Sequence, residues 1–414
     1  MSPASSEVRD RCVLERSGLD RLFGALRSRG FRVVGPTVRD RAIIYDELQS
    51  SGDLPAGWSD EQDGGKYRLK KRKDEALFAF ASSPHSWKRF LHPPTEVLWR
   101  ATREGKRVTI ETLNDAPVKT AFVGVRACDL HAIAIQDRVF SGGAYIDAGY
   151  KARRDSNFIV AVNCGRASGT CFCVSMSTGP KAASGFDLAL TEIIDPDRHY
   201  FVIEIGTDAG REVVRELELP ASSEPEDVRA HEMVAKAARQ MGRRMDTDGI
   251  KELLQANLES PCWDQVAARC LNCTNCTMVC PTCFCTSVED TTDLTGNEAE
   301  RVQKWDSCFN TQFSYIHGGS IRPGARSRYR QWLTHKLASW IDQFGTSGCV
   351  GCGRCITWCP VGIDITEEVH GIRDRDLRNR NTKLHAQSGP RTALKPSELP
   401  VVAAEEAGSQ PLRS

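Results

Sequence analysis

One cysteine spacing is written twice in the C-terminal part of the chain, and it limits the fold more than any other feature. The string C-x2-C-x2-C-x3-C-P runs from Cys270 to Pro281 and returns in full from Cys349 to Pro360. Two-residue gaps between thiols require the backbone to curl tightly, and small residues such as Gly351 and Gly353 permit a close approach. The proline ends the short helix that the last cysteine would otherwise continue. Each string therefore predicts a tight loop that directs several thiols toward one point.

This is the spacing of bacterial ferredoxins, which hold two cubane [4Fe-4S] clusters. In that pattern the first three thiolates of a string bind one cluster and the fourth binds the other. The expected ligands of cluster one are Cys270, Cys273, Cys276 and Cys359, and those of cluster two are Cys349, Cys352, Cys355 and Cys280. The long insertion between Cys280 and Cys349 could change this crossed pairing, but the eight ligands do not depend on it.

Zinc is the main alternative occupant of these cysteines. A structural zinc ion usually takes two C-x2-C pairs separated by a longer loop, whereas each string here supplies four cysteines together and a proline after the last. Disulfides are a poorer explanation, because the 17 cysteines are odd in number and eleven of them lie between Cys270 and Cys359. The chain opens with no charged and apolar leader, so we expect a cytoplasmic protein with reduced thiols.

Four cysteines in the N-terminal part could supply a third cluster. Cys128 follows an expected strand at 121–125 and Cys164 follows another at 158–162, and the ends of neighbouring strands are where loops converge on a ligand. With Cys171 and Cys173 they make four thiols. One alternative is that they are ordinary small buried residues. A second alternative is that Cys171 and Cys173 join three downstream cysteines, namely Cys283, Cys285 and Cys308.

The organisation expected for the chain is an α/β domain followed by a mainly α-helical, ferredoxin-like dicluster domain. Apolar periodicity predicts a helix at 19–26 and strands at 31–34, 42–45, 76–80, 108–112, 121–125, 158–162 and 200–205. Residues 53–65 are expected to form a loop, and 326–344 an amphipathic helix with a solvated basic face. We predict domains at 1–248 and 249–375, with a disordered tail at 376–414.

Other functional signals are weak. Net charge is +1, from 55 basic and 54 acidic residues, which argues against a bulk electrostatic fit to nucleic acid. Apolar runs are too short to span a bilayer. The chain contains no nucleotide-binding glycine fingerprint and no nucleophile elbow. A basic run at 66–73, read as a strand with a solvated face, is the one feature that suggests an anionic ligand.

With these motifs in place, the chain resembles the beta subunit of cytoplasmic NAD(P)-linked [NiFe] hydrogenases, also called sulfhydrogenase. The A subunit of anaerobic sulfite reductase is a relative of that family. The resemblance spans about residues 66 to 370 and is carried by the two cysteine strings and four further stretches, which are Val125–Asp129, Thr170–Cys173, Lys304–Phe309 and Arg326–Lys336.

The resemblance implies an iron–sulfur electron-transfer subunit without a catalytic site of its own. Its expected partners are a flavin-bearing, NAD(P)-binding subunit and the hydrogenase subunits. The alternative function is a reductase subunit for sulfur, polysulfide or sulfite, with its own site around the N-terminal cysteines.

Overall fold

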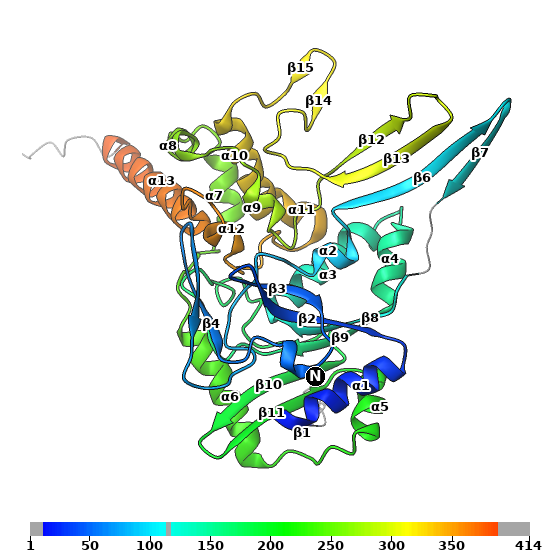
Figure 1. The fold of residues 1–414 in the computed structure, drawn as a ribbon. Helices are drawn as coiled ribbons and strands as arrows, with labels where there is room; N and C mark the ends of the chain where they lie inside the picture. The colour runs from blue at the N-terminus through cyan, green and yellow to red at the C-terminus, as the bar shows by residue number, and fades with distance from the viewer. Residues whose placement is uncertain (1–10, 113–116, 388–414) are drawn as a thin grey trace, which may run out of the picture. The chain divides into compact units, whose positions relative to one another are not determined.

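The computed structural model describes residues 11–112 and 117–387. The described residues up to Ile372 form one compact unit. Its largest element is a mixed seven-stranded sheet built from the N-terminal part of the chain (Figure 1). In spatial order its strands are β1 (Arg11–Glu15), β11 (Arg198–Ile205), β10 (Leu188–Asp195), β9 (Asn157–Val162), β8 (Thr120–Val125), β2 (Arg32–Arg39) and β3 (Ala42–Glu47). The middle strands, from β10 to β2, are parallel, and the outer pairs are antiparallel.

Successive residues of a strand point to opposite faces of the sheet, so an apolar strand has two apolar faces to bury. Helices cover both faces of this sheet. Val123 and Val160 face the side of α1 (Leu19–Ser28) and α5 (Asp208–Glu216). Their neighbours Phe122 and Ile159 face the side of α3 (Ala127–Ser141) and α4 (Ala148–Asp155). The N-terminal region is therefore the sheet-rich α/β structure that the sequence predicts, with both sheet faces buried.

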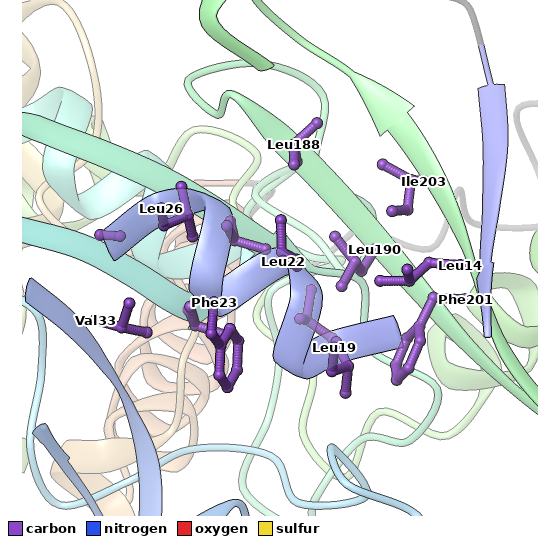
Figure 2. Packing of buried hydrophobic residues seen from close by; sticks show 14 of the residues in the cluster. Leu14, Leu19, Leu22, Phe23, Leu26, Val33, Leu188, Leu190, Phe201 and Ile203 are labelled. Carbon is purple, nitrogen blue, oxygen red and sulfur yellow. The ribbon is translucent and has the colours of Figure 1, made fainter. Parts of the chain in front are cut away.

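Helix α1 shows why the apolar spacing was informative. Leu19, Leu22, Phe23 and Leu26 recur at helical spacing and are fully buried against β10 and β11. Figure 2 shows Leu22 toward Leu190 and Leu19 toward Phe201, while the Phe23 ring points away from these two strands. Each buried side chain of this size stabilises the fold by about 1.5–3 kcal/mol relative to exposure.

A second sheet joins strands from the N-terminal and the C-terminal parts of the sequence. Its four strands are β12 (Thr286–Thr292), β13 (Glu298–Trp305), β6 (Thr95–Glu104) and β7 (Arg107–Thr112), in that order. The β13–β6 pair is antiparallel and links residues about 200 positions apart, from Glu298 opposite Thr102 to Lys304 opposite Thr95. Two short hairpins complete the strands, β4 (Trp58–Asp63) with β5 (Lys66–Lys71) and β14 (Tyr315–Ile316) with β15 (Gly319–Ser320).

Most of the remaining helices lie in the C-terminal part. They are α7 (Ile250–Ala256), α8 (Cys262–Arg269), α9 (Asn275–Met278), α10 (Ala325–Thr334), α11 (Trp340–Phe344), α12 (Arg354–Thr357) and α13 (Ile365–Gln387). Helix α2 (Lys88–Leu91) precedes β6, and α6 (Glu224–Arg239) packs on β10 and β11. Helix α13 reaches Gln387, so the first part of the expected tail is helical, and residues 388–414 lie outside the described chain.

Three local expectations were wrong. Residues 76–80 are buried but form no strand, because their backbone groups bond to side chains instead of a neighbouring strand. The amides of Leu77 and Phe78 donate to the Glu192 carboxylate, and Arg126 donates to the carbonyls of Phe78 and Phe80. The expected loop at 53–65 contains strand β4.

The third error concerns the basic face of the helix at 326–344. A π-helical turn at His335–Ser339 divides this segment, and Arg328 and Lys336 are only 8% and 3% exposed. Arg326 and Arg330 both pair with Glu259. Two of the four positive charges are therefore buried and the other two are paired with a carboxylate, so they do not form a free basic surface.

Candidate iron–sulfur site

The two cysteine strings fold into loops with the same backbone. Asn272 and Thr274 in the first loop have φ angles of 52° and 67°, and their counterparts Gly351 and Gly353 have 64° and 76°. A single helical turn follows in each case, α9 after the first loop and α12 after the second, at corresponding positions. Left-handed conformations at Asn and Thr are uncommon and cost about 1–3 kcal/mol each, so their repetition points to a geometric requirement of the loop.

The first set of thiols surrounds one cavity. Cys270, Cys273, Cys276 and Cys359 line it, together with Cys355 and an apolar wall that includes Phe309, Tyr329 and Trp332. Burial raises the pKa of Cys276 well above its usual value, and the thiols of Cys308, Cys270, Cys359 and Cys273 raise it further. Cys359 belongs to the second string, so this cavity receives thiols from both strings.

The second set contains Cys280, Cys349, Cys352 and Cys355. Burial raises the pKa of Cys349 to about 12, and the thiols of Cys352 and Cys280 contribute to the increase. Burial also raises the pKa of Cys355, again with contributions from Cys349, Cys352 and Cys280. Cys359 and Cys280 thus each lie near thiols of the other string, while Cys355 is close to both sets.

A buried lysine stands next to the second set. Lys336, in the π-helical turn, places its Nζ 3.4 Å from the Sγ of Cys280, 3.0 Å from the Thr282 hydroxyl and 2.9 Å from the Gly348 carbonyl. A hydrogen bond from the Cys283 thiol and the charge of Lys336 lower the pKa of Cys280. Since a thiolate is the form that binds metal, this ammonium group favours ligation by Cys280.

The N-terminal cysteines also lie together, directly against the second loop. Cys128 is in the first turn of α3 and Cys164 follows β9, and the parent strands β8 and β9 are parallel neighbours. Burial raises the pKa of Cys173, and the nearby thiols of Cys164 and Cys171 add to the effect. Cys128 and Cys173 share an apolar cluster with Cys352 of the second loop.

Glycines in the second loop make this contact possible. A Cβ at Gly351 would lie 2.7 Å from the Cα of Cys173, and one at Gly353 would lie 2.5 Å from the carbonyl oxygen of Thr170. The amide of Phe172 donates to the carbonyl of Gly351 at 2.9 Å. The sequence suggested that these glycines let the backbone of the loop approach a cluster. In the structure their missing side chains leave room for the backbone of residues 170–173.

A buried ion pair joins the second loop to the first turn of α3. The guanidinium of Arg354, which is fully buried, donates to both carboxylate oxygens of Asp129 at 2.8 and 3.2 Å and to the Ser83 carbonyl at 2.9 Å. Arg354 lies between two expected ligands, Cys352 and Cys355, and Asp129 follows Cys128. Sequence reasoning missed this pair, since its members are 225 residues apart.

The remaining cysteines occupy a different place from the 171–173 segment. Cys283 is hydrogen bonded to Cys280. Burial raises the pKa of Cys308 to about 12, and the Cys285 thiol raises it further. Lys88, only 3% exposed, donates to the Cys283 carbonyl at 3.1 Å and packs 3.7 Å over the Trp305 ring. The structure thus places Cys283 beside Cys280 and Cys308 near both Cys285 and Cys276, whereas Cys171 and Cys173 lie beside Cys164.

Two observations test whether the thiols fit a cubane cluster. Within residues 11–112 and 117–387, no three Cys, His, Asp or Glu side chains converge closely enough to hold a single metal ion. Zinc would require thiolates roughly 3.8 Å apart, as its Zn–S distance of about 2.3 Å implies, whereas a cubane keeps its thiolates farther apart. The hydroxyl of Tyr329 and the indole N–H of Trp332 are buried beside the first set without a hydrogen-bond partner. A cluster there would supply sulfur acceptors for both donors.

Comparisons with known proteins agree with this geometry. A family model for the 4Fe-4S dicluster domain matches residues 269–363, which contain all eight cysteines of the two strings. Sulfhydrogenase 2 subunit beta of Pyrococcus furiosus is 33% identical over 263 residues, which are 63% of this chain and 76% of the relative. The chain belongs to the sulfhydrogenase beta-subunit family. No solved structure matches it.

As a member of the sulfhydrogenase beta-subunit family, the chain carries its dicluster domain in the C-terminal part, after the sheet-rich region. Over the part of the chain that the structure describes, no helix has the length and apolar character needed to cross a membrane. The family and the thiol geometry both point to iron–sulfur chemistry.

Proposed function

We propose that this chain is an iron–sulfur electron-transfer subunit of a hydrogenase or sulfur-reducing complex. The observation that carries the proposal is the pair of matching loops, in which the fourth thiol of each string lies near thiols of the other string. In the proposal each loop gives its first three thiols to one set and its fourth to the other. Cys276, within α9, and Cys280, two residues after its end, thereby serve different sets. Two sites joined in this way are neighbours by construction.

In this proposal the first set holds one [4Fe-4S] cluster and the second set another. Such clusters, when bound, accept and donate single electrons. The protein supplies buried thiols whose raised pKa values mean that metal binding releases protons. It also supplies apolar walls that exclude water, and the donors Tyr329 and Trp332 on the side of the first set.

We further propose that Cys128, Cys164, Cys171 and Cys173 hold a third cluster. Support comes from their mutual proximity, their burial and their contact with the second loop through Cys352. Burial raises the pKa of Cys171 to about 11, so these thiols need a cation to become thiolates at neutral pH. A third cluster here would adjoin the second one.

The partners proposed are a flavin-bearing, NAD(P)-binding subunit and hydrogenase subunits, in the cytoplasm. The first loop is the suitable contact face. Cys273 is exposed, and Leu271 and Val361, which line the same cavity, are 62% and 41% exposed. Apolar side chains exposed beside a redox centre suit a docking surface for a partner whose own contact surface is apolar.

The number of clusters is tested by measuring iron and acid-labile sulfide per chain after anaerobic preparation. We expect about twelve irons for three clusters, and about eight if the N-terminal thiols bind none. Electron paramagnetic resonance of the reduced chain should show interacting clusters, and Cys171→Ser should remove about four irons while Cys12→Ser removes none. A preparation that contains zinc in place of iron would refute the proposal.

Electron transfer is tested with the purified complex. Omission of this chain should abolish coupling between the two half-reactions while each partner keeps its own activity. Turnover of polysulfide or sulfite by the isolated, reconstituted chain with an artificial reductant would instead assign it the reductase function.

A further inference from the structure

A large cavity lies at the carboxyl ends of β9 and β10, outside the two cysteine loops. Its volume is about 730 Å³, and its walls come from the segment after β5, the residues that follow β9, strand β10 and helix α6. Cavities of about 300–1,000 Å³ are typical of small-molecule sites. The carboxyl ends of parallel strands are also where α/β sheets usually bind ligands.

Within the described chain, two of the basic side chains that line this cavity are not engaged in an ion pair. Five basic side chains line it, against the three carboxylates of Asp74, Glu192 and Glu232. Three of the five are engaged, because Arg72 pairs with Asp74, Arg166 with Asp60, and Arg229 with Asp195. Over the described residues, the other two, Lys236 and Arg239, form no hydrogen bond or ion pair. Both are exposed on α6. The cavity therefore offers two uncommitted cations on one wall.

The lining carboxylates contact groups other than these two cations. Glu192 already accepts hydrogen bonds from the amides of Leu77 and Phe78, at 2.6 and 2.9 Å, and from the ring of His199 at 2.9 Å. Glu232 lies 3.5 Å from Arg229. An anionic group is the ligand that would satisfy Lys236 and Arg239, since charge-assisted hydrogen bonds to oxyanions are the strong interactions of both side chains.

Another part of the lining is apolar and adjoins the N-terminal thiols. Ala79, Ala167, Ile194 and Met233 contribute to it. Ala167 packs against Cys171, and Cys164 lies between two lining residues, Asn163 and Gly165. A bare inorganic anion would leave these apolar side chains in contact with water, whereas an organic anion would cover them.

We propose that this cavity binds a small organic anion. An oxyanion group of the ligand pairs with Lys236 and Arg239, and its apolar body rests on Ala167 and Met233. Phosphate and sulfonate groups share the required chemistry. The site lies on the sheet and α6, so its existence does not depend on the electron-transfer function proposed above.

The test uses the full chain, prepared anaerobically with its clusters, and calorimetric titration at low ionic strength. The probes are ADP for a phosphate ligand, 8-anilinonaphthalene-1-sulfonate for a sulfonate ligand, and inorganic phosphate and sulfite as bare anions. We expect one organic probe to bind at a single site, more tightly than either bare anion. The double variant Lys236→Gln, Arg239→Gln should weaken that binding on the order of tenfold or more, because two charged hydrogen bonds are lost.

The control removes the same two charges elsewhere. Lys106 and Arg107 lie in the exposed hairpin of β6 and β7. The double variant Lys106→Gln, Arg107→Gln should leave binding of the probes unchanged. Gln240→Glu is a second variant that keeps the size of a lining side chain and adds a negative charge, so it should weaken binding several-fold. Its result decides the question if the double variant does not fold.

Three results would overturn the proposal. They are no binding of either organic probe at millimolar concentration, equal binding by all variants, and inorganic phosphate or sulfite binding as tightly as the organic probes. Because the readout is binding, failure here leaves iron content and electron transfer unchanged, and the two proposals can be separated.

Discussion

The two cysteine loops have the same spacing and the same backbone, yet they lie in different surroundings. The first loop is open to solvent at Cys273, whereas Cys349 and Cys352 of the second are buried under the segment at 170–178. The first loop adopts its two left-handed positions with Asn272 and Thr274, and the second does so with glycines. The spacing of the cysteines thus determines the backbone conformation of the loop. The segments packed against each loop determine which residues its other positions tolerate.

Corresponding positions of the two loops make matched pairs for mutation. Arg354 corresponds to Asn275, Gly353 to Thr274 and Gly351 to Asn272. In each pair the second loop has the residue that contacts the N-terminal region, and the first has a residue that faces a less crowded environment. Substitutions should therefore have large effects in the second loop and small effects in the first.

The largest effect is expected for Arg354→Gln. This change leaves the Asp129 carboxylate buried without its partner, and loss of one member of a buried ion pair destabilises a protein by about 3–5 kcal/mol. Asn275→Ala, at the matching position, removes one long hydrogen bond of 3.3 Å to the Trp358 carbonyl and should cost about 0.5 kcal/mol. Denaturant midpoints of the anaerobic, iron-loaded chains measure both. Similar losses at the two positions would contradict the asymmetry.

Gly353→Ala is expected to cost about 2–4 kcal/mol. Its Cβ would meet the Thr170 carbonyl at 2.5 Å, and its φ of 76° is unfavourable for any side chain. Thr274→Ala at the matching position should change stability by less than about 0.5 kcal/mol.

Gly24→Ala is a control for the chemical change itself. Gly24 lies on the exposed side of α1 with nothing within 4 Å of its Cβ position, so alanine should stabilise the chain by about 0.5–1 kcal/mol. A loss at Gly24 as large as that at Gly353 would show that the contact with Thr170 is not the cause. The same denaturant titrations give this result.

The sequence was sufficient for features that depend on local spacing. The cysteine strings predicted both loops, the apolar periodicity of residues 19–26 predicted α1, and the apolar runs at 121–125 and 158–162 predicted β8 and β9. Each of these needs only a short window and a general rule of chain geometry. The boundary near residue 249 and the ligand roles of the cysteines stay predictions.

The errors have a common physical cause, which is a distant partner that changes the environment of a residue. Lys336 looked like part of a solvated face, but Gly348 and Thr282 provide buried acceptors for its ammonium group. Residues 76–80 looked like a strand, but Glu192 and Arg126 satisfy their backbone groups. Strand β6 pairs with β13, which no local pattern could indicate.

A smaller effect is expected from Tyr329→Phe. If the unpartnered hydroxyl donates to the cluster of the first set, its removal destabilises the more negative, reduced form and lowers the midpoint potential of that cluster by roughly 40 mV, for a hydrogen bond of about 1 kcal/mol. Only one of the reduced cluster signals should shift in a redox titration followed by electron paramagnetic resonance. Tyr150→Phe, which loses a hydrogen bond to Asp137 away from both loops, should leave every potential unchanged.

The last predicted effect is a gain in stability within the first loop. Thr274→Gly removes the side chain from a residue whose φ is 67°, and relief of that strain exceeds the entropy that glycine adds to the unfolded chain, so we expect a gain of about 0.5–1 kcal/mol. Iron content should remain unchanged, because the backbone keeps its conformation. A loss of stability, or of iron, would mean that the threonine side chain supports the first loop directly. The two loops would then differ in how they are held, as well as in what surrounds them.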